Sequence, residues 1–197
     1  MIFQLFIPNK QQHFITVDGV VVVLWLVYFT IFWGFEGLLF SKGSLIGMVY
    51  GISLVCVSLF LLIAFHFRYE PLRGKLQGDI VLAADGIHVN DHYYALTDIT
   101  SIDFFVGDYY GHNPPMRHTL NPRLSQGVNN YIKFTDAIGK EHQYYFKLFS
   151  ANGSQELYPI IKQATVLGKM PLLRGLELLG INDYDEIQRF KAEHFKG

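Results

Sequence analysis

Cysteine is almost absent from this sequence. Cys56 is the only one, so no disulfide can form within the chain, and a reducing compartment is compatible with it. The residue lies inside an apolar run, and structural cysteines buried among apolar residues are inert. We therefore interpret Cys56 as a small packing residue and not as a reactive thiol.

Charge is also scarce, and the shortage is local. Charged residues make up 17% of the 197 residues, and the formal net charge is −1. Residues 19–67 contain only two of them, Glu36 and Lys42. A chain without a basic excess lacks the field that draws nucleic acid to a protein, so no nucleic-acid partner is predicted.

Motifs of known catalytic chemistry are missing as well. The sequence has no Gly-x-Gly-x-x-Gly, P-loop, Gly-x-Ser-x-Gly or His-Glu-x-x-His pattern. His88 and His92 lie four residues apart, but across a predicted turn, whereas zinc needs three or four ligands held in place. The sequence thus predicts no enzyme, no metal site and no cofactor.

What the sequence does contain is two long apolar runs, at about residues 19–40 and 44–66. A helix that crosses a bilayer needs about 20 residues, and its backbone must be hydrogen-bonded internally. The two runs, within residues 19–67, therefore predict a pair of transmembrane helices. Because the connection between them is short, they are expected to form an antiparallel hairpin with both chain ends on the same side.

The basic residues that flank the runs predict the orientation of this hairpin. Arg68, Arg73 and Lys75 follow the second run and Lys10 precedes the first, whereas Lys42 stands between them. Basic residues favour the cytoplasmic side. We therefore expect a multi-pass protein of the bacterial inner membrane, with both termini in the cytoplasm and membrane lipids as partners.

Three glycines recur every four residues near the start of the second run: Gly43, Gly47 and Gly51. Small residues at this spacing let two helices approach closely. One interpretation is packing within the hairpin, and the other is a homo-oligomer formed through the second helix. Residues 1–18 also leave two alternatives open, because Met1 to Pro8 is apolar but short: a segment at the membrane interface or an additional strand.

The remaining chain predicts a separate β-rich domain at 68–167. Turn signals occur at Asp85-Gly86, at Asn90-Asp91 and at 136–140, and residues 130–135 alternate between apolar and polar. Such spacing is typical of an antiparallel sheet, a sandwich or a small barrel. Helices are predicted after Ser154, at 171–179 and after Asn182, so residues 168–197 form a helical extension.

This order of elements resembles bacterial membrane-anchored pleckstrin-homology-like (PH-like) proteins, the YcxB-like group among them. The residues that carry the resemblance are 80–89 and 94–104, followed by the strands at 131–134 and 144–146. The resemblance implies a membrane α-hairpin joined to an α+β domain, in which a bent seven-strand antiparallel sheet or barrel is capped by a C-terminal helix. It implies protein or lipid binding without known catalysis, and it transfers no functional residues.

Two groups of residues are the candidate binding sites. A long polar loop at 107–129 contains His112, Arg117, His118 and Arg123, and long loops are often functional. It is either a contact loop for a partner protein or an anionic headgroup, or a simple excursion between strands. The basic residues Arg68, Arg73 and Lys75 are the candidate contact with an anionic membrane surface, beside their role in orientation.

The sequence therefore predicts a non-enzymatic interaction module, anchored in the inner membrane, that recruits or regulates a protein partner at the cytoplasmic face. Two alternatives remain open at this point. One is a protein that binds or senses anionic lipids, and the other is an immunity-type protein that neutralises a toxin at the membrane.

Overall fold

A computed structural model describes residues 1–9, 17–34, 45–113 and 124–195. The chain divides into two compact units, which are described separately below. A helical unit comprises residues 11–71 and 113–124, and a sheet unit comprises residues 1–10, 72–112 and 125–197.

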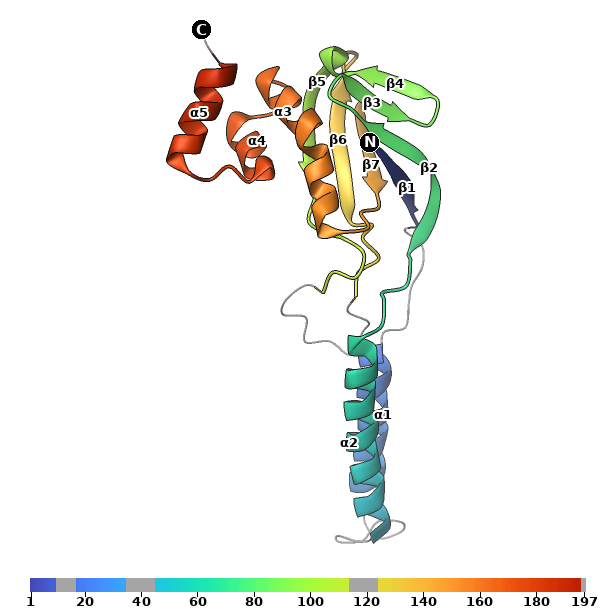
Figure 1. The fold of residues 1–197 in the computed structure, drawn as a ribbon. Helices are drawn as coiled ribbons and strands as arrows, with labels where there is room; N and C mark the ends of the chain where they lie inside the picture. Colours follow the sequence, from blue (N-terminus) through green and yellow to red (C-terminus); the bar gives the residue numbers. More distant parts are fainter. Residues whose placement is uncertain (10–16, 35–44, 114–123, 196–197) are drawn as a thin grey trace. The chain divides into compact units, whose positions relative to one another are not determined.

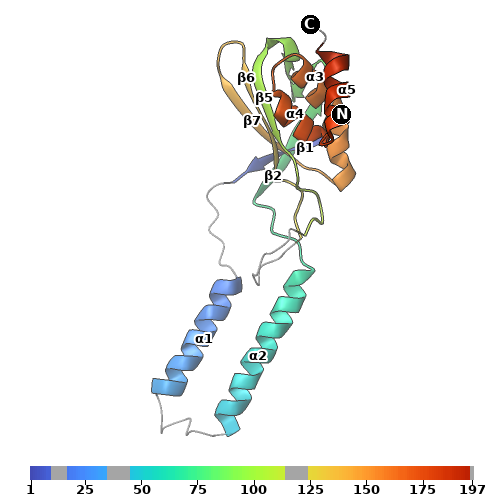
Figure 2. The ribbon, with the colours of Figure 1, turned by 90° about the vertical axis from the view of Figure 1, so that its left-hand side faces the viewer.

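The helical unit contains two helices, α1 (Val17–Gly34) and α2 (Leu45–His66), which run side by side in opposite directions (Figure 2). Nε1 of Trp25 donates a hydrogen bond to Oγ of Ser58 across the pair, at 3.4 Å. A Cβ atom at Gly51 would lie 2.9 Å from Oη of Tyr28 on α1, so this glycine lets the helices approach. Gly43 lies outside the described residues.

The two helices expose much of their apolar surface. Among the exposed large side chains are Val22 on α1 and Met48 and Phe60 on α2. Most of the apolar surface of each helix therefore does not lie against the other helix.

The predicted transmembrane hairpin is contradicted by the structure. Among the residues described, no helix meets both the length and the apolar character needed to cross a bilayer. The prediction rested on the composition of two apolar runs, whereas a span also requires one continuous apolar helix of sufficient length. Helix α1, for example, has 18 residues and contains the charged residue Asp18. The membrane part of the predicted fold class, the multi-pass character and the inner-membrane location are therefore wrong.

The sheet unit is built on seven antiparallel strands in the order β4-β3-β2-β1-β7-β6-β5 (Figure 1). In chain order the strands of the described residues are β1 (Ile2–Pro8), β2 (Gly74–Leu82), β3 (Gly86–Val89), β4 (His92–Ala95), β5 (Ile99–Phe105), β6 (Asn130–Asp136) and β7 (Glu141–Phe146). Neighbouring strands in the sheet are consecutive in the chain, except that β1 pairs with β7.

Strand β1 settles the two alternatives left open for the N-terminus, since it lies in the middle of the sheet. Its Phe3 pairs with Ile80 of β2, and its Leu5 pairs with Phe146 of β7. The N-terminal amino group of Met1 donates to the carbonyl oxygen of Leu82 at 3.0 Å. Residues 2–8 therefore link the two halves of the sheet.

The core fills the space between one face of the sheet and helix α3 (Tyr158–Val166), which follows the 3-10 helix η2 (Ala151–Leu157). Alternate strand residues point into it, as the two-residue period of a strand requires. Its fully buried members include Ile80, Ile87, Phe104, Ile132, Phe134 and Phe146 from the strands and Leu157, Ile160 and Ile161 from η2 and α3.

The C-terminal extension forms helices α4 (Leu172–Leu179) and α5 (Tyr184–His194). Gly180 adopts φ 72° directly after α4, a conformation that favours glycine and ends the helix as predicted. Asp183, and not the neighbouring residue 182, caps α5, because its carboxylate accepts from the amides of Asp185 and Glu186.

The extension also covers the free edge of β5. The amide of Ile102 donates to the carbonyl oxygen of Lys169 at 3.0 Å. Arg174 of α4 donates from Nη2 to the carbonyl oxygen of Phe104 at 2.6 Å and from Nε to the carboxylate of Asp103 at 3.0 Å. An uncovered edge strand invites pairing with other chains, so this contact protects one end of the sheet.

Candidate functional site

The candidate residues predicted from the sequence are divided between the two units and the residues that the structure does not describe. Arg68 belongs to the helical unit, whereas Arg73 and Lys75 belong to the sheet unit. All three are exposed. Three of the four predicted loop residues, Arg117, His118 and Arg123, lie outside the described residues.

The fourth loop residue, His112, is held at the described base of the loop. Its ring stacks on that of Tyr109 with centroids 4.8 Å apart, and its Nδ1 lies 3.6 Å from Oδ1 of Asp108. Asp108 is itself buried, and its Oδ2 accepts from Oγ of Ser125 at 2.7 Å and from the amide of Asn129 at 3.0 Å. These contacts join the two ends of the loop.

Asn130 completes this junction, and it is fully buried. Its Oδ1 accepts from the amides of Gly107 and Asp108, and its Nδ2 donates to the carbonyl oxygens of Asp108 and Gly127. All four hydrogen-bonding positions of the side-chain amide are thus used. The Asn130 side-chain amide therefore has no free hydrogen-bonding position, and it holds the two ends of the loop base together.

A second polar group lies at the turn between β6 and β7. Nε2 of His142 lies 2.9 Å from Oδ2 of Asp136, while Oδ1 of Asp136 accepts from the amides of Ile138 and Lys140 at 3.1 and 2.9 Å. The hydrogen bond with His142 is the main reason why the pKa of Asp136 lies below its usual value, despite some opposing desolvation. An ionised carboxylate only accepts hydrogen bonds, so Nε2 of His142 carries the proton.

Aromatic rings enclose the His142 side chain. Its ring stacks on Phe134 and meets Tyr94 of β4 at an interplanar angle of 54°, with centroids 5.0 Å apart in both cases. The hydroxyl of Tyr144 lies 3.5 Å from Nδ1. Burial first, and then the hydrogen bond with Tyr94, raise the pKa of Tyr144 to about 12, so the Tyr144 hydroxyl stays neutral near pH 7.

A pocket of about 240 Å³ opens beside this group. Its walls are residues 93–95, 98–99 and 136–138, and we refer to it as the edge pocket. Both of its charged lining residues, Asp98 and Asp136, are carboxylates. Nearby, the hydroxyl of Tyr93 lies 3.4 Å from Oδ2 of Asp85, and desolvation followed by the charge of Asp85 raises the pKa of Tyr93.

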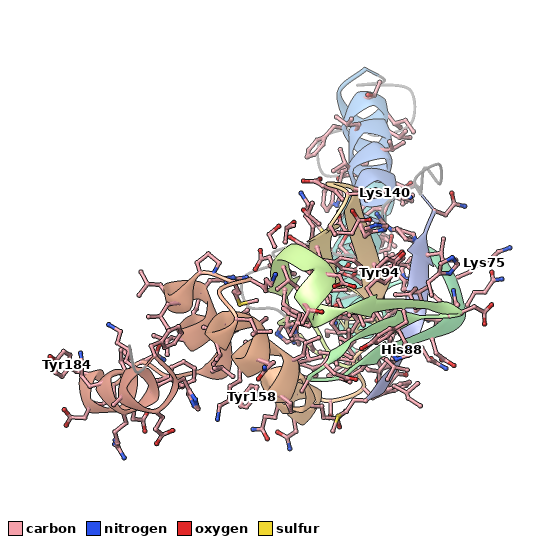
Figure 3. The ribbon with its side chains drawn as sticks, turned by 90° about the horizontal axis from the view of Figure 1, so that it is seen from above. Lys75, His88, Tyr94, Lys140, Tyr158 and Tyr184 are labelled. Carbon is pink, nitrogen blue, oxygen red and sulfur yellow. The ribbon has the colours of Figure 1, made fainter. Side chains whose placement is uncertain are left out.

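The edge pocket lies at the open edge of β4. Tyr93 and Tyr94 are consecutive strand residues, so their side chains leave opposite faces of the sheet. The pocket that both residues line therefore includes part of β4, which is the last strand at this end of the sheet. Figure 3 shows Tyr94 on β4, well away from Tyr184 on α5, and Figure 1 agrees that the extension lies elsewhere in the sheet unit.

A wider hollow of about 710 Å³ lies over β1, β2 and β3 and includes Ile2, Gly78 and His88 in its lining. Gly78 adopts φ 81°, and a Cβ atom there would meet the side-chain amide of Asn90. The hollow therefore borders an irregular point of β2. It lacks a partly buried polar group comparable with the Asp136–His142 pair.

The geometry around His142 suits support of a surface better than proton transfer. The His142 side chain is only 9% exposed, with Asp136 at one ring nitrogen and Tyr144 near the other. A general base must come within hydrogen-bond distance of its substrate, whereas Nε2 of His142 contacts Asp136 and the Tyr144 hydroxyl lies 3.5 Å from Nδ1. Within the described ranges, no group of three or more metal-ligating side chains occurs.

Sequence reasoning missed the edge pocket, although it located the turn at 136–140. The pocket joins Tyr94 to Asp136, which lie 42 positions apart in the chain, and such proximity appears only once the sheet has folded. The local signals are the pair Tyr93-Tyr94 and the spacing of Asp136 and His142 across a turn.

Comparison with known proteins adds no assignment. No family model, no curated protein and no solved structure matches this chain.

Proposed function

We propose that this chain is a non-enzymatic binding module that docks a protein partner at the edge pocket. The observation that carries the proposal is the pocket itself, which has aromatic walls and carboxylates and is held by the Asp136–His142 pair. Pockets for small molecules typically measure about 300–1,000 Å³. At about 240 Å³, the edge pocket is smaller than this range, which favours a single protruding side chain as its occupant.

The surroundings of the pocket also favour a protein. Ile138 is 87% exposed at its rim and Tyr93 is half exposed. Aromatic and aliphatic side chains around a central anchor are typical of protein–protein contacts. The resemblance to PH-like proteins supports the same function, since it implies binding without catalysis. Recruitment or regulation of the partner is the proposed consequence.

Site-specific cross-linking tests this proposal. A photoreactive amino acid replaces Ile138 in the full chain, and the control carries it at Leu173, which is 80% exposed on α4. In the native cells we expect one protein adduct at position 138, none at position 173, and loss of the adduct when Asp98→Lys is added. The adduct is identified and its affinity for the purified chain is measured.

Absence of an adduct at position 138 would overturn the proposal, and so would either of two further results. One is equal labelling at positions 138 and 173, which would show no preference for the pocket. The other is an adduct at 138 whose purified partner binds wild type and Asp98→Lys equally well.

A further inference from the structure

The two ends of the sheet differ in how their backbone groups are satisfied. At β5 the chain itself covers the edge, through the carbonyl oxygen of Lys169 and the guanidinium of Arg174. At β4, the described part of the chain places no such segment. The sheet unit therefore keeps one covered and one open edge.

The register of the β3–β4 hairpin shows which groups of β4 point outward. Val89 pairs with His92, and Ile87 pairs with Tyr94. The amide of Leu96 continues this series by donating to the carbonyl oxygen of Asp85 at 2.8 Å. Because hydrogen-bonded positions alternate along an antiparallel strand, the amides of Tyr93 and Ala95 face the open edge. Both residues line the edge pocket.

The chemistry of the pocket selects the side chain that would enter it. Asp98 and Asp136 supply negative charge, and the Tyr94 ring supplies an aromatic wall of the kind that attracts cations. Neither of two nearby lysines lines the pocket. Nζ of Lys169 donates to the carbonyl oxygen of Thr97 at 3.1 Å, and Lys140 is also absent from the lining.

From the open edge and the acidic pocket together, we infer that an extended segment of the protein partner adds to β4 and places an arginine or lysine side chain in the edge pocket. Addition of a strand to an open edge is a recurrent mode of peptide recognition, in which the backbone supplies affinity and a side-chain pocket supplies specificity. The inference rests on the proposed function and specifies which part of the protein partner binds at the edge pocket.

The test uses a defined probe, the blocked pentapeptide Thr-Val-Arg-Val-Thr, titrated into the full chain and followed by the NMR signals of backbone amides. A matched peptide carries citrulline in place of arginine, which keeps the shape and removes the charge. We expect shifts at the amides of Tyr93, Ala95 and Asp98. We also expect binding of the citrulline peptide to be about fivefold weaker.

A backbone variant tests strand addition separately from charge. Ala95 has φ −64° and ψ 139°, which proline adopts without strain, and the preceding residue is extended as proline requires. Ala95→Pro therefore removes one outward amide while the hairpin bonds remain, whereas Ala95→Ser keeps the amide. Loss of one hydrogen bond should weaken arginine-peptide binding about fivefold in Ala95→Pro and leave Ala95→Ser near wild type.

The outcomes separate this inference from the proposed function. Equal binding of the two peptides would overturn the cationic anchor, and unchanged binding in Ala95→Pro would overturn strand addition. Failure of the arginine peptide to bind at all would also overturn the inference, while an adduct at position 138 that depends on Asp98 would leave the proposed function standing. Absence of that adduct would overturn the function itself.

Discussion

Nε2 of His142 lies 2.9 Å from Oδ2 of Asp136 across the turn between β6 and β7. The pair ties the two strands together where the edge pocket begins, and its partner groups are the ring of Phe134 and the backbone amides of the turn. We interpret it as the fixed support of the binding surface.

Replacement of Asp136 by asparagine should reduce the pH dependence of stability in acid. The pKa of Asp136 is lowered in the folded protein, so its stabilising contribution is complete above the usual value of about 4 and is lost as the pH falls through the lowered pKa. Urea unfolding at pH 7 and pH 3 measures this. Wild type should lose more stability than Asp136→Asn between these pH values, and an equal loss would refute the assignment.

At high pH, Tyr144 should make the stability of the folded protein fall as the pH rises. Its pKa is raised to about 12, so the unfolded chain releases the proton at lower pH than the folded one, and stability falls as the pH rises from about 10. Tyr144→Phe should lose less stability over this range. Ultraviolet titration of the folded protein should also show one fewer late-ionising tyrosine in the variant.

Asn130→Ala should destabilise the protein by about 3 kcal/mol, because it leaves several buried amide and carbonyl groups without partners. The matched control is Asn129→Ala, since the Asn129 residue is exposed and its interaction with Asp108 is through its backbone. Chemical denaturation gives both values. Comparable losses of unfolding free energy in the two variants would show that the buried Asn130 side chain does not hold the loop base in place.

Arg174→Met should cost about 1 kcal/mol of stability and make the β5 edge more prone to self-association. The variant loses the charged hydrogen bonds to Phe104 and Asp103. The expected loss of stability is small because the Arg174 side chain is 30% exposed and its charge is screened by solvent. Arg189→Met on α5 is the control. Light scattering of both variants on mild heating should show earlier aggregation for Arg174→Met, and identical onset would contradict a protective role.

Local signals predicted much of the sheet and the end of one helix. The alternation at residues 130–135 marks β6, the Asn90-Asp91 signal lies at the β3–β4 turn with Asn90 at φ 51°, and Gly180 ends α4. Each of these depends on neighbours in the sequence. Ser154 was a weaker guide, because it lies within η2 and its hydroxyl donates to the carbonyl oxygen of Ala151, while α3 begins at Tyr158.

Relationships between distant residues could not be predicted in this way. The place of β1 depends on pairing with strands that begin some 70 and 140 positions later, and the edge pocket depends on Tyr94 meeting Phe134 and His142. Hydropathy alone was also insufficient for residues 19–67, because apolar composition does not establish a helix that meets the requirements of a membrane span. The basic residues Arg68, Arg73 and Lys75 are close in sequence but fall in two separate units.

The most direct test of the central claim is the affinity of the protein captured at position 138 for the purified wild type, Asp98→Asn and Asp91→Asn. Each variant removes one exposed carboxylate, but only Asp98 lines the edge pocket. We predict binding about threefold weaker for Asp98→Asn and unchanged for Asp91→Asn. Equal affinities for all three proteins would contradict docking at the edge pocket.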